Sequence, residues 1–275
     1  YHCISRFDQL PAIPEIHSRL TRLLSEQPYD QKHVLQLLKQ DPALTIRTLQ
    51  LANSPYLGQR GIACIDEAIT VLDPDVLRAM LLTCKIQTAA EQKLFFQAGL
   101  SLPYRRCVLT AKICGQIFRD PELANQAYTL ALIHDIGKVV IAMCLPQQLL
   151  EIIATKKISQ RPCHQIETEL LGCSHAEIGA YVLGVLGLPG GLVDSVAFHH
   201  HPAAAFTNNH ALLAALHVTD ALLDAARDHG NILQAQLELD TEFLASSGVL
   251  DQLPQWRQLV SQEFASTTTS SSLNL

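Results

Sequence analysis

Apolar positions recur every three or four residues along most of the chain, which is the spacing of one buried helix face. In the first such stretch, residues 11–24, the apolar side chains are Ile13, Ile16, Leu20, Leu23 and Leu24. The same reading predicts further helices over 31–38, 42–52, 66–71, 75–88, 104–118, 122–132, 163–171, 191–201 and 209–228. The pattern therefore predicts an all-α protein.

Short polar signals mark where several of these helices begin. Asp41-Pro42 and Asp73-Pro74 each place a capping carboxylate before a proline, which fits the first helical position because its missing N–H would have no partner there. Ser174 and Glu177 form a capping-box sequence, in which each side chain can accept from the other residue's backbone N–H. We expect a helix to start directly after each signal.

The helical pattern is interrupted near residues 99–103 and is lost near the end of the chain. We expect residues 1–98 to form an N-terminal helical subdomain and residues 99–265 to form a second one. The segment 266–275 is rich in Ser and Thr and has no apolar stripe, so it is predicted to be a disordered tail.

Composition narrows the class of protein. The 275 residues include 45 Leu and 30 Ala, and 20 Lys and Arg against 26 Asp and Glu give a net charge of −6. Because no basic run offsets this balance, we expect no nucleic-acid partner. No apolar run reaches the ~18 residues of a membrane span, and the scattered cysteines fit a reducing compartment. We expect a cytoplasmic protein without membrane contact and, because the chain begins at Tyr1 rather than Met, a further domain upstream.

Histidines concentrate in the second half of the chain, where nine of the 12 lie between residues 134 and 229. The pair His134-Asp135 ends an apolar helix, His175 begins one, and His199-His200 ends another. Imidazole nitrogens and carboxylate oxygens bind Fe, Mn or Zn, which can lower the pKa of a bound water. The alternative is hydrogen-bonded core histidines, and spacing alone leaves both open. The histidines expected to be structural are His164, His210, His217 and His229, while His201 is expected in a loop.

Residues 41–58 resemble the segment that typifies HDOD domains, the HD-related output domains of bacterial signalling proteins. Other segments follow in that family's order, and the resemblance covers roughly residues 8–228. It implies an N-terminal helical bundle packed on an HD-domain-like helical bundle, with a regulatory role. By similarity to HD and HD-GYP hydrolases, the metal ligands would be His134, Asp135, His175, His199, His200 and Asp220.

Two departures from the hydrolase pattern bear on activity. The ligand histidine that HD hydrolases carry before the His-Asp motif is matched by Arg106, which cannot coordinate a metal. Its guanidinium could pair internally with Asp135 or Asp220, or it could be a solvated surface residue. The Gly-Tyr-Pro element of HD-GYP proteins is also missing after Pro202, which argues against hydrolysis of cyclic di-GMP of that type.

Two hypotheses follow. The favoured one is a non-catalytic signalling module that binds a protein partner or a small nucleotide effector. The other is a metal-dependent phosphohydrolase acting on a nucleotide or phosphate ester, with one or two ions of Fe, Mn or Zn. In that case Lys138 would hold a substrate phosphate, although a lysine at a helix end more often extends its ammonium group into solvent.

Overall fold

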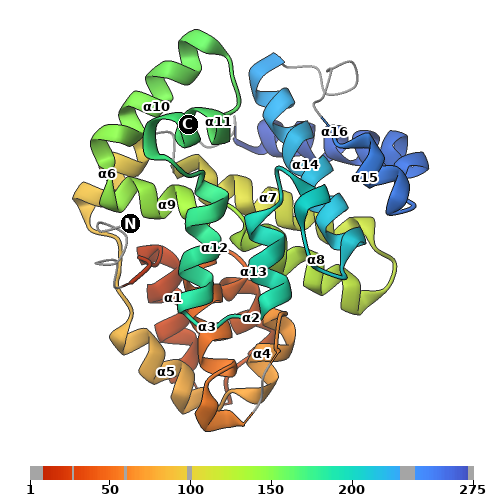
Figure 1. Cartoon of the computed structure of the whole chain (residues 1–275). Helices are drawn as coiled ribbons and strands as arrows, with labels where there is room; N and C mark the ends of the chain where they lie inside the picture. The colour runs from red at the N-terminus through yellow and green to blue at the C-terminus, as the bar shows by residue number, and fades with distance from the viewer. Residues whose placement is uncertain (1–8, 27, 59–60, 98–100, 230–238, 272–275) are drawn as a thin grey trace.

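The computed structural model of the chain describes residues 9–26, 28–58, 61–97, 101–229 and 239–271. All regular elements in these ranges are helices, and the one β contact is an isolated parallel bridge between Ala12 and Ile86. The predicted all-α class is confirmed (Figure 1). In chain order the helices are α1 (Pro14–Ser25), α2 (Gln31–Leu38), α3 (Pro42–Ala52), η2 (Pro55–Leu57), α4 (Ile65–Val71), α5 (Pro74–Thr83), α6 (Ala89–Gln97), α7 (Ser101–Ile117), α8 (Pro121–Ile133), α9 (Ile136–Cys144), α10 (Pro146–Ser159), α11 (Cys163–Leu171), α12 (His175–Val185), α13 (Gly190–Ala197), η3 (Pro202–Ala204), α14 (His210–His229), α15 (Thr241–Ser246), η4 (Leu250–Gln252) and α16 (Leu253–Ser271).

Helices α1 to α5 form a bundle at the bottom of Figure 1, in red and orange. Asp41 joins two of them, because one carboxylate oxygen accepts from the N–H groups of Ala43 and Leu44 at the start of α3. Its other oxygen accepts from Ile13 N at 2.6 Å, just before α1. The predicted Asp-Pro start of α3 is confirmed, and the cap also fixes where α1 begins.

Helix α8 connects this bundle to the rest of the molecule. The hydroxyl of Thr129 accepts from Ile65 N at 3.1 Å, and Tyr128 Oη donates to the carbonyl of Lys39 at 3.0 Å. One cluster of buried apolar side chains runs from Ala12 in the N-terminal bundle to Leu216 in α14. The two bundles therefore share a continuous hydrophobic core.

Helices α7 to α13 surround the break between α8 and α9. Helix α7 packs on α8, and α12 packs on both α9 and α13. Within the described residues one helical stretch, Pro121–Cys144, is long and apolar enough to cross a membrane, but 78% of its apolar window is buried inside the protein. This stretch is the core of the second bundle.

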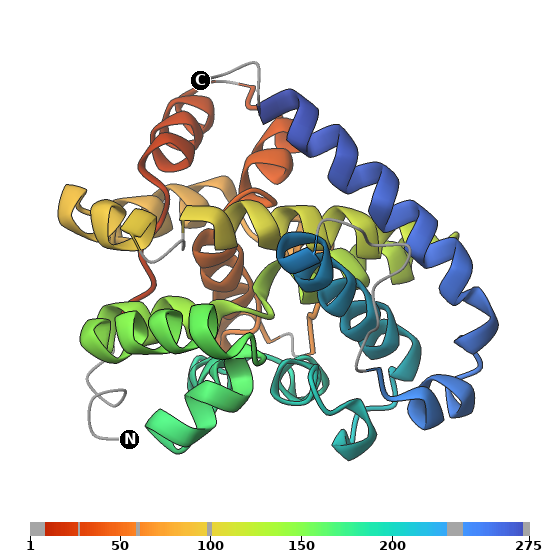
Figure 2. The same ribbon diagram turned by 90° about the horizontal axis from the view of Figure 1, so that it is seen from above.

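The C-terminal helices form a second apolar cluster on α7 and α14. Viewed from above, α16 runs in blue along one side of the molecule (Figure 2), and it contacts α7 and α14. Here the structure differs from the disordered tail predicted over 266–275, because α16 continues to Ser271; residues 272–275 lie outside the described residues. The hydroxyls of Ser266 and Thr267 both donate to the carbonyl of Glu263, so these polar residues bond within the helix.

Candidate functional site

Five of the predicted ligand residues lie at helix ends. His134 is the C-cap of α8 and Asp135 the N-cap of α9, and both side chains are buried at this break. His175 is the first residue of α12, after the predicted capping box of Ser174, which is confirmed. His199 and His200 follow Phe198, the C-cap of α13. Residues from three separate segments therefore meet at the ends of their helices.

The imidazoles of His175, His199 and His200 each offer one nitrogen, and these nitrogens lie within 4.8 Å of one another. Nε2 of His175 lies 3.1 Å from Nε2 of His200. Nδ1 of His199 donates to the carbonyl of Val196 at 2.8 Å, so its Nε2 is the acceptor nitrogen. This Nε2 is buried and has no hydrogen-bond partner in the described structure. A second group of donors within 4.8 Å comprises His134, Asp135 and His199.

Glu167 on α11 fixes the orientation of His175. Its Oε2 accepts from Nδ1 of His175 at 2.6 Å and from the backbone N–H of the same residue at 2.7 Å. A carboxylate behind a histidine is the usual support of a metal-bound imidazole. Burial would raise the pKa of Glu167, but the nearby positive charge of His175 and its hydrogen bonds hold that pKa below its ordinary value.

Glu167 was not among the site residues predicted from the sequence. It lies eight residues before His175 and belongs to no motif that we identified. Glu169, two residues further on, pairs instead with Arg161 at the surface. Only the position of α11 against α12 distinguishes the two glutamates, and no spacing in the sequence reveals it.

Asp135 is paired with Lys138, which lies three residues later on α9. Lys138 Nζ donates to Asp135 Oδ2 at 2.7 Å, while Oδ1 lies 3.1 Å from His175 Nε2. Burial would raise the pKa of Asp135, but the Lys138 ammonium, His134 and His175 together hold it well below its usual range. The Lys138 side chain is 16% exposed, so its ammonium group neutralises Asp135 inside the protein rather than extending into solvent.

Arg106 on α7 pairs with two carboxylates of α14. Its guanidinium bonds Asp220 Oδ1 at 2.5 Å, and it also bonds Asp224, one helical turn later. The same Asp220 oxygen lies 3.3 Å from His134 Nε2. Of the alternatives for Arg106, the internal ion pair is the one formed, with Asp220 rather than Asp135, and the side chain is 14% exposed. Burial would raise the pKa of Asp220, but Arg106 and His134 together keep that pKa well below its usual range.

Protonation differs among the three convergent histidines. Burial lowers the pKa of His199 to about 3 and that of His200 well below its ordinary value, so both are neutral at pH 7. Burial would also lower the pKa of His175, but the carboxylates of Glu167 and Asp135 together raise the pKa to about 9. The two neutral imidazoles have the protonation state that metal ligands require.

Three further histidines surround this group. The ring of His164 stacks on His200 with centroids 4.1 Å apart, and His201 meets His164 edge-on at 5.5 Å. His164 therefore packs against a candidate ligand. His217 donates from Nδ1 to the carbonyl of His199 at 2.8 Å, the structural role expected of it. His201 lies in a loop, also as predicted.

The residues fit a bound metal unequally. The side of the site with His175, His199 and His200 presents nitrogen donors, including the unpaired buried Nε2 of His199, which is the kind of atom that a cation would satisfy. On the other side, Asp220 is already bonded by Arg106. The donor chemistry therefore suits a metal at the imidazoles, whereas Asp220 already has a cationic partner in Arg106.

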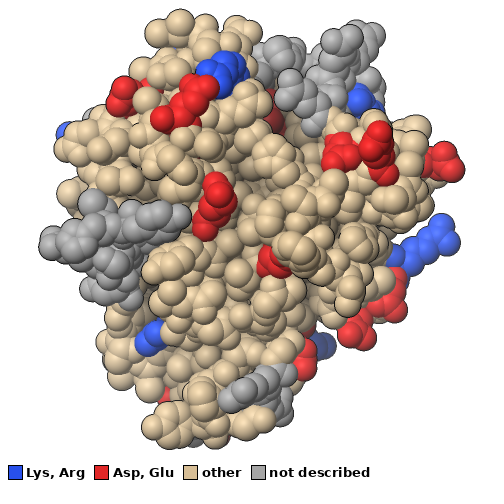
Figure 3. All heavy atoms as spheres, viewed as in Figure 1, with Lys and Arg blue, Asp and Glu red and all other residues tan. Residues whose placement is uncertain are grey.

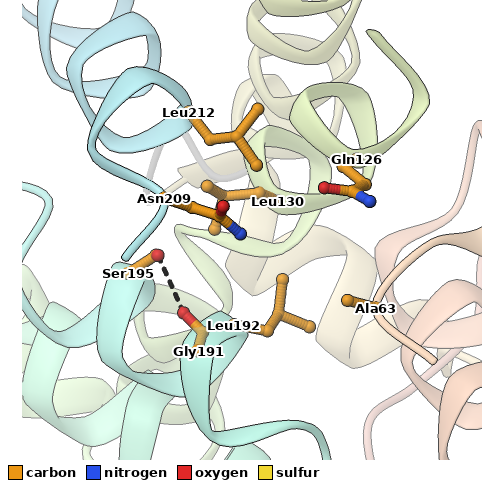
Figure 4. A pocket seen from close by; sticks show the side chains of 8 residues that line it. All are labelled: Ala63, Gln126, Leu130, Gly191, Leu192, Ser195, Asn209 and Leu212. Atoms are coloured by element: carbon orange, nitrogen blue, oxygen red, sulfur yellow. Dashed lines mark hydrogen bonds between the residues drawn. The ribbon is translucent and has the colours of Figure 1, made fainter. Parts of the chain in front are cut away.

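A separate small pocket lies where the N-terminal bundle meets α8, α13 and α14. Figure 4 shows Gln126, Asn209 and Ser195 around it, with the Ser195 hydroxyl bonded to the carbonyl of Gly191. Its volume of about 30 Å³ holds one or two water molecules, whereas ligand pockets usually measure roughly 300–1,000 Å³. It is too small for a nucleotide.

Comparisons with known proteins agree with this fold. The model of the HDOD domain family matches residues 10–202. An uncharacterized protein of Treponema pallidum (strain Nichols) is 26% identical over an alignment of 203 residues that covers 71% of this chain and 38% of that protein. The chain therefore spans well under half the length of this relative.

Three solved structures are similar. An HDOD domain protein with unknown function from Geobacter sulfurreducens is 26% identical, with a TM-score of 0.52, over 98% of this chain and 93% of that one. A virulence factor from Campylobacter jejuni is 21% identical, with a TM-score of 0.63, over 93% and 95%. The MmoQ response regulator from Methylococcus capsulatus is 20% identical, with a TM-score of 0.59, over 81% and 90%; these last two likenesses concern the fold alone. Since the family model covers most of its length, the chain belongs to the HDOD domain family.

Proposed function

We propose that this protein is a non-catalytic signal-transduction module that acts by binding a protein partner or a small nucleotide effector. The observation that carries the proposal is the Arg106 guanidinium bonded to Asp220 and Asp224. A hydrolase of the HD type needs Asp220 for its metal, whereas here this carboxylate is buried and already neutralised. The resemblance to output domains of signalling proteins supports the same role.

Helix α12 connects the histidine cluster with the surface. It begins at His175, and its side chains Tyr181 and Val185 are 48% and 70% exposed. These two residues are four apart, so they share one face of the helix. A ligand that moved His175 would thus act on a helix that presents apolar side chains to a partner. On the face drawn in Figure 3, which includes α12, charged side chains are sparse and Lys and Arg form no cluster. This face therefore suits an apolar partner surface better than a nucleic acid.

The test is a screen for phosphohydrolase turnover. The purified protein is incubated with nucleoside triphosphates, cyclic dinucleotides and p-nitrophenyl phosphate esters, each with Zn²⁺, Mn²⁺ or Fe²⁺. We expect release of phosphate or nucleotide no faster than from the Asp135→Ala variant. Turnover by the wild-type protein that disappears in Asp135→Ala, while the variant keeps its helical circular dichroism spectrum, would refute the proposal.

The second candidate function is a metal-dependent phosphohydrolase. The observation in its favour is the convergence of His175, His199 and His200 beside Asp135. A bound metal would supply an activated water, and Lys138, at 16% exposure, would have to leave Asp135 to reach a phosphate. The same screen separates the two candidates, because only a hydrolase gives turnover that depends on Asp135.

A further inference from the structure

The site is asymmetric in the chemistry of its donors. At one side three imidazoles converge, and Nε2 of His199 lies buried without a hydrogen-bond partner in the described structure. At the other side the carboxylate of Asp220 accepts from the guanidinium of Arg106 at 2.5 Å and lies 3.3 Å from His134 Nε2. A metal ion at the first side meets the free lone pair of His199 Nε2, whereas an ion near Asp220 meets a resident cation.

Charge leads to the same division. Lys138 pairs with Asp135, and Arg106 pairs with Asp220. A divalent ion beside Asp220 would therefore add positive charge next to a buried guanidinium, which is unfavourable in a low-dielectric interior. At the three imidazoles no permanent cation is bonded to the free nitrogen of His199 in the described structure.

We propose that the chain binds one Zn²⁺-class ion, held by the imidazoles of His175, His199 and His200, and that Arg106 takes the place of a second ion. Imidazole donors suit borderline metals such as Zn²⁺, whereas Mg²⁺ and Mn²⁺ prefer sites rich in carboxylate and water oxygens. Glu167 positions one ligand through Nδ1 of His175. The ion would join the start of α12 to the end of α13, and its binding requires no catalytic turnover.

The first experiment measures metal stoichiometry and affinity. The full chain is stripped with a chelator, dialysed against Zn²⁺ and analysed for metal content, and binding is titrated by calorimetry. We expect one equivalent of Zn²⁺ per chain and no displacement of it by an excess of Mn²⁺ or Mg²⁺. Either no tightly bound Zn²⁺ or two equivalents in the wild-type protein would overturn the proposal.

Variants identify the ligands. His200→Ala should abolish tight binding, and Glu167→Gln should weaken it about 10- to 100-fold by loosening His175. The matched control is His33→Ala, which removes an exposed histidine of α2 and should leave the affinity unchanged. Tight binding retained in a folded His200→Ala protein, or lost in His33→Ala, would show that the ion binds elsewhere.

The role of Arg106 has its own variant. Arg106→His replaces the resident cation with an imidazole beside His134, Asp135 and Asp220, and should raise the stoichiometry from one equivalent to two. A folded Arg106→His protein that still binds one equivalent would refute the assignment of Arg106 as a substitute for the second ion. Should this variant not fold, the wild-type stoichiometry and the His200→Ala result still decide whether the single-ion site exists. Metal uptake is read independently of turnover, so it can fail or succeed apart from the proposed regulatory function.

Discussion

The contact between α9 and α12 gives the sharpest test of how the site is assembled. Gly137 lies on α9, between Asp135 and Lys138, and a Cβ added to it would lie 1.9 Å from the carbonyl oxygen of His175. It would also lie 2.8 Å from the backbone nitrogen of Gly179. Because real Cβ contacts do not fall below 3.0 Å, Gly137→Ala must separate the two helices by at least 1.1 Å, the difference between 3.0 and 1.9.

The magnitude follows from the atoms involved. Overpacking a core commonly costs about 1–3 kcal/mol when side chains can adjust, but here the opposing atoms are backbone, so the cost lies at or above the upper end. Alanine gains about 1 kcal/mol over glycine from helix propensity, which offsets part of this. We expect a net loss of about 2–3 kcal/mol, and a fall in the thermal midpoint of about 4–12 °C for a chain of this size.

The assay is urea and thermal unfolding followed by circular dichroism, with two glycine variants of α12 as controls. At Gly184 the nearest atom to an added Cβ is a Val193 methyl at 3.9 Å, so Gly184→Ala should be neutral or stabilising. At Gly179 the nearest atom to an added Cβ is the backbone nitrogen of Gly137 at 3.2 Å. The loss of stability in Gly179→Ala should therefore fall between those of Gly184→Ala and Gly137→Ala. A Gly137→Ala protein within about 0.5 kcal/mol of wild type, the range of an ordinary surface change, would refute this reasoning.

Three other variants test separate features. Burial raises the pKa of Asp41 from 3.8 to about 6 despite its three N–H donors. The folded state therefore holds this proton more tightly, and the contribution of Asp41 to stability is full below pH 4 and falls by about 3 kcal/mol as the pH rises through 6. Urea unfolding from pH 4 to 7 should show the unfolding free energy of the wild type falling by about 3 kcal/mol relative to that of Asp41→Asn. A difference between the two proteins that does not vary with pH contradicts a raised pKa of Asp41. Arg106→Met should leave Asp220 uncompensated and lower the unfolding free energy by about 3 kcal/mol. The control is Arg161→Ala at the surface, which should leave the stability unchanged. Equal losses of stability in the two variants would count against a buried Arg106–Asp220 pair. Asn53→Ala removes four hydrogen bonds, to Leu49 O, Ile62 O, Gly61 N and Ile62 N. Calorimetry should find its melting temperature lower by several degrees. The melting temperature of Asn53→Asp should be intermediate, because this variant keeps the acceptor oxygens and loses the amide donors.

Local signals in the sequence located the helix starts that a side chain caps. Asp41 and the Ser174-Glu177 box act as predicted because a cap depends on residues within three or four positions of one another. Helix boundaries without such a cap were less accurate. The predicted helix at 75–88 ends at Thr83, and the first helix begins at Pro14 rather than Pro11. In that case the N–H of Ile13 is bonded by Asp41, far away in the sequence, so local periodicity could not reveal the start.

The site was predictable as a set of residue types and not as a network of contacts. The ligand pattern pointed to residues that the fold does bring together, such as His134, Asp135 and His199. The charge and protonation of the site depend on contacts between helices, namely Arg106 with Asp224 and His175 with Glu167. Neither pair has a fixed spacing in the chain, since each is created by how two helices pack.

Helix α14 joins the two hydrophobic clusters, and this has a consequence for folding. The family model ends at Pro202, yet α14, which begins at His210, supplies apolar side chains to both clusters. Its residues Asp220 and Asp224 also hold Arg106 of α7 across the junction. The cooperative folding unit is therefore longer than the region of family likeness. A chain cut after Pro202 would expose the apolar face of α7 and leave the Arg106 guanidinium without its two carboxylates.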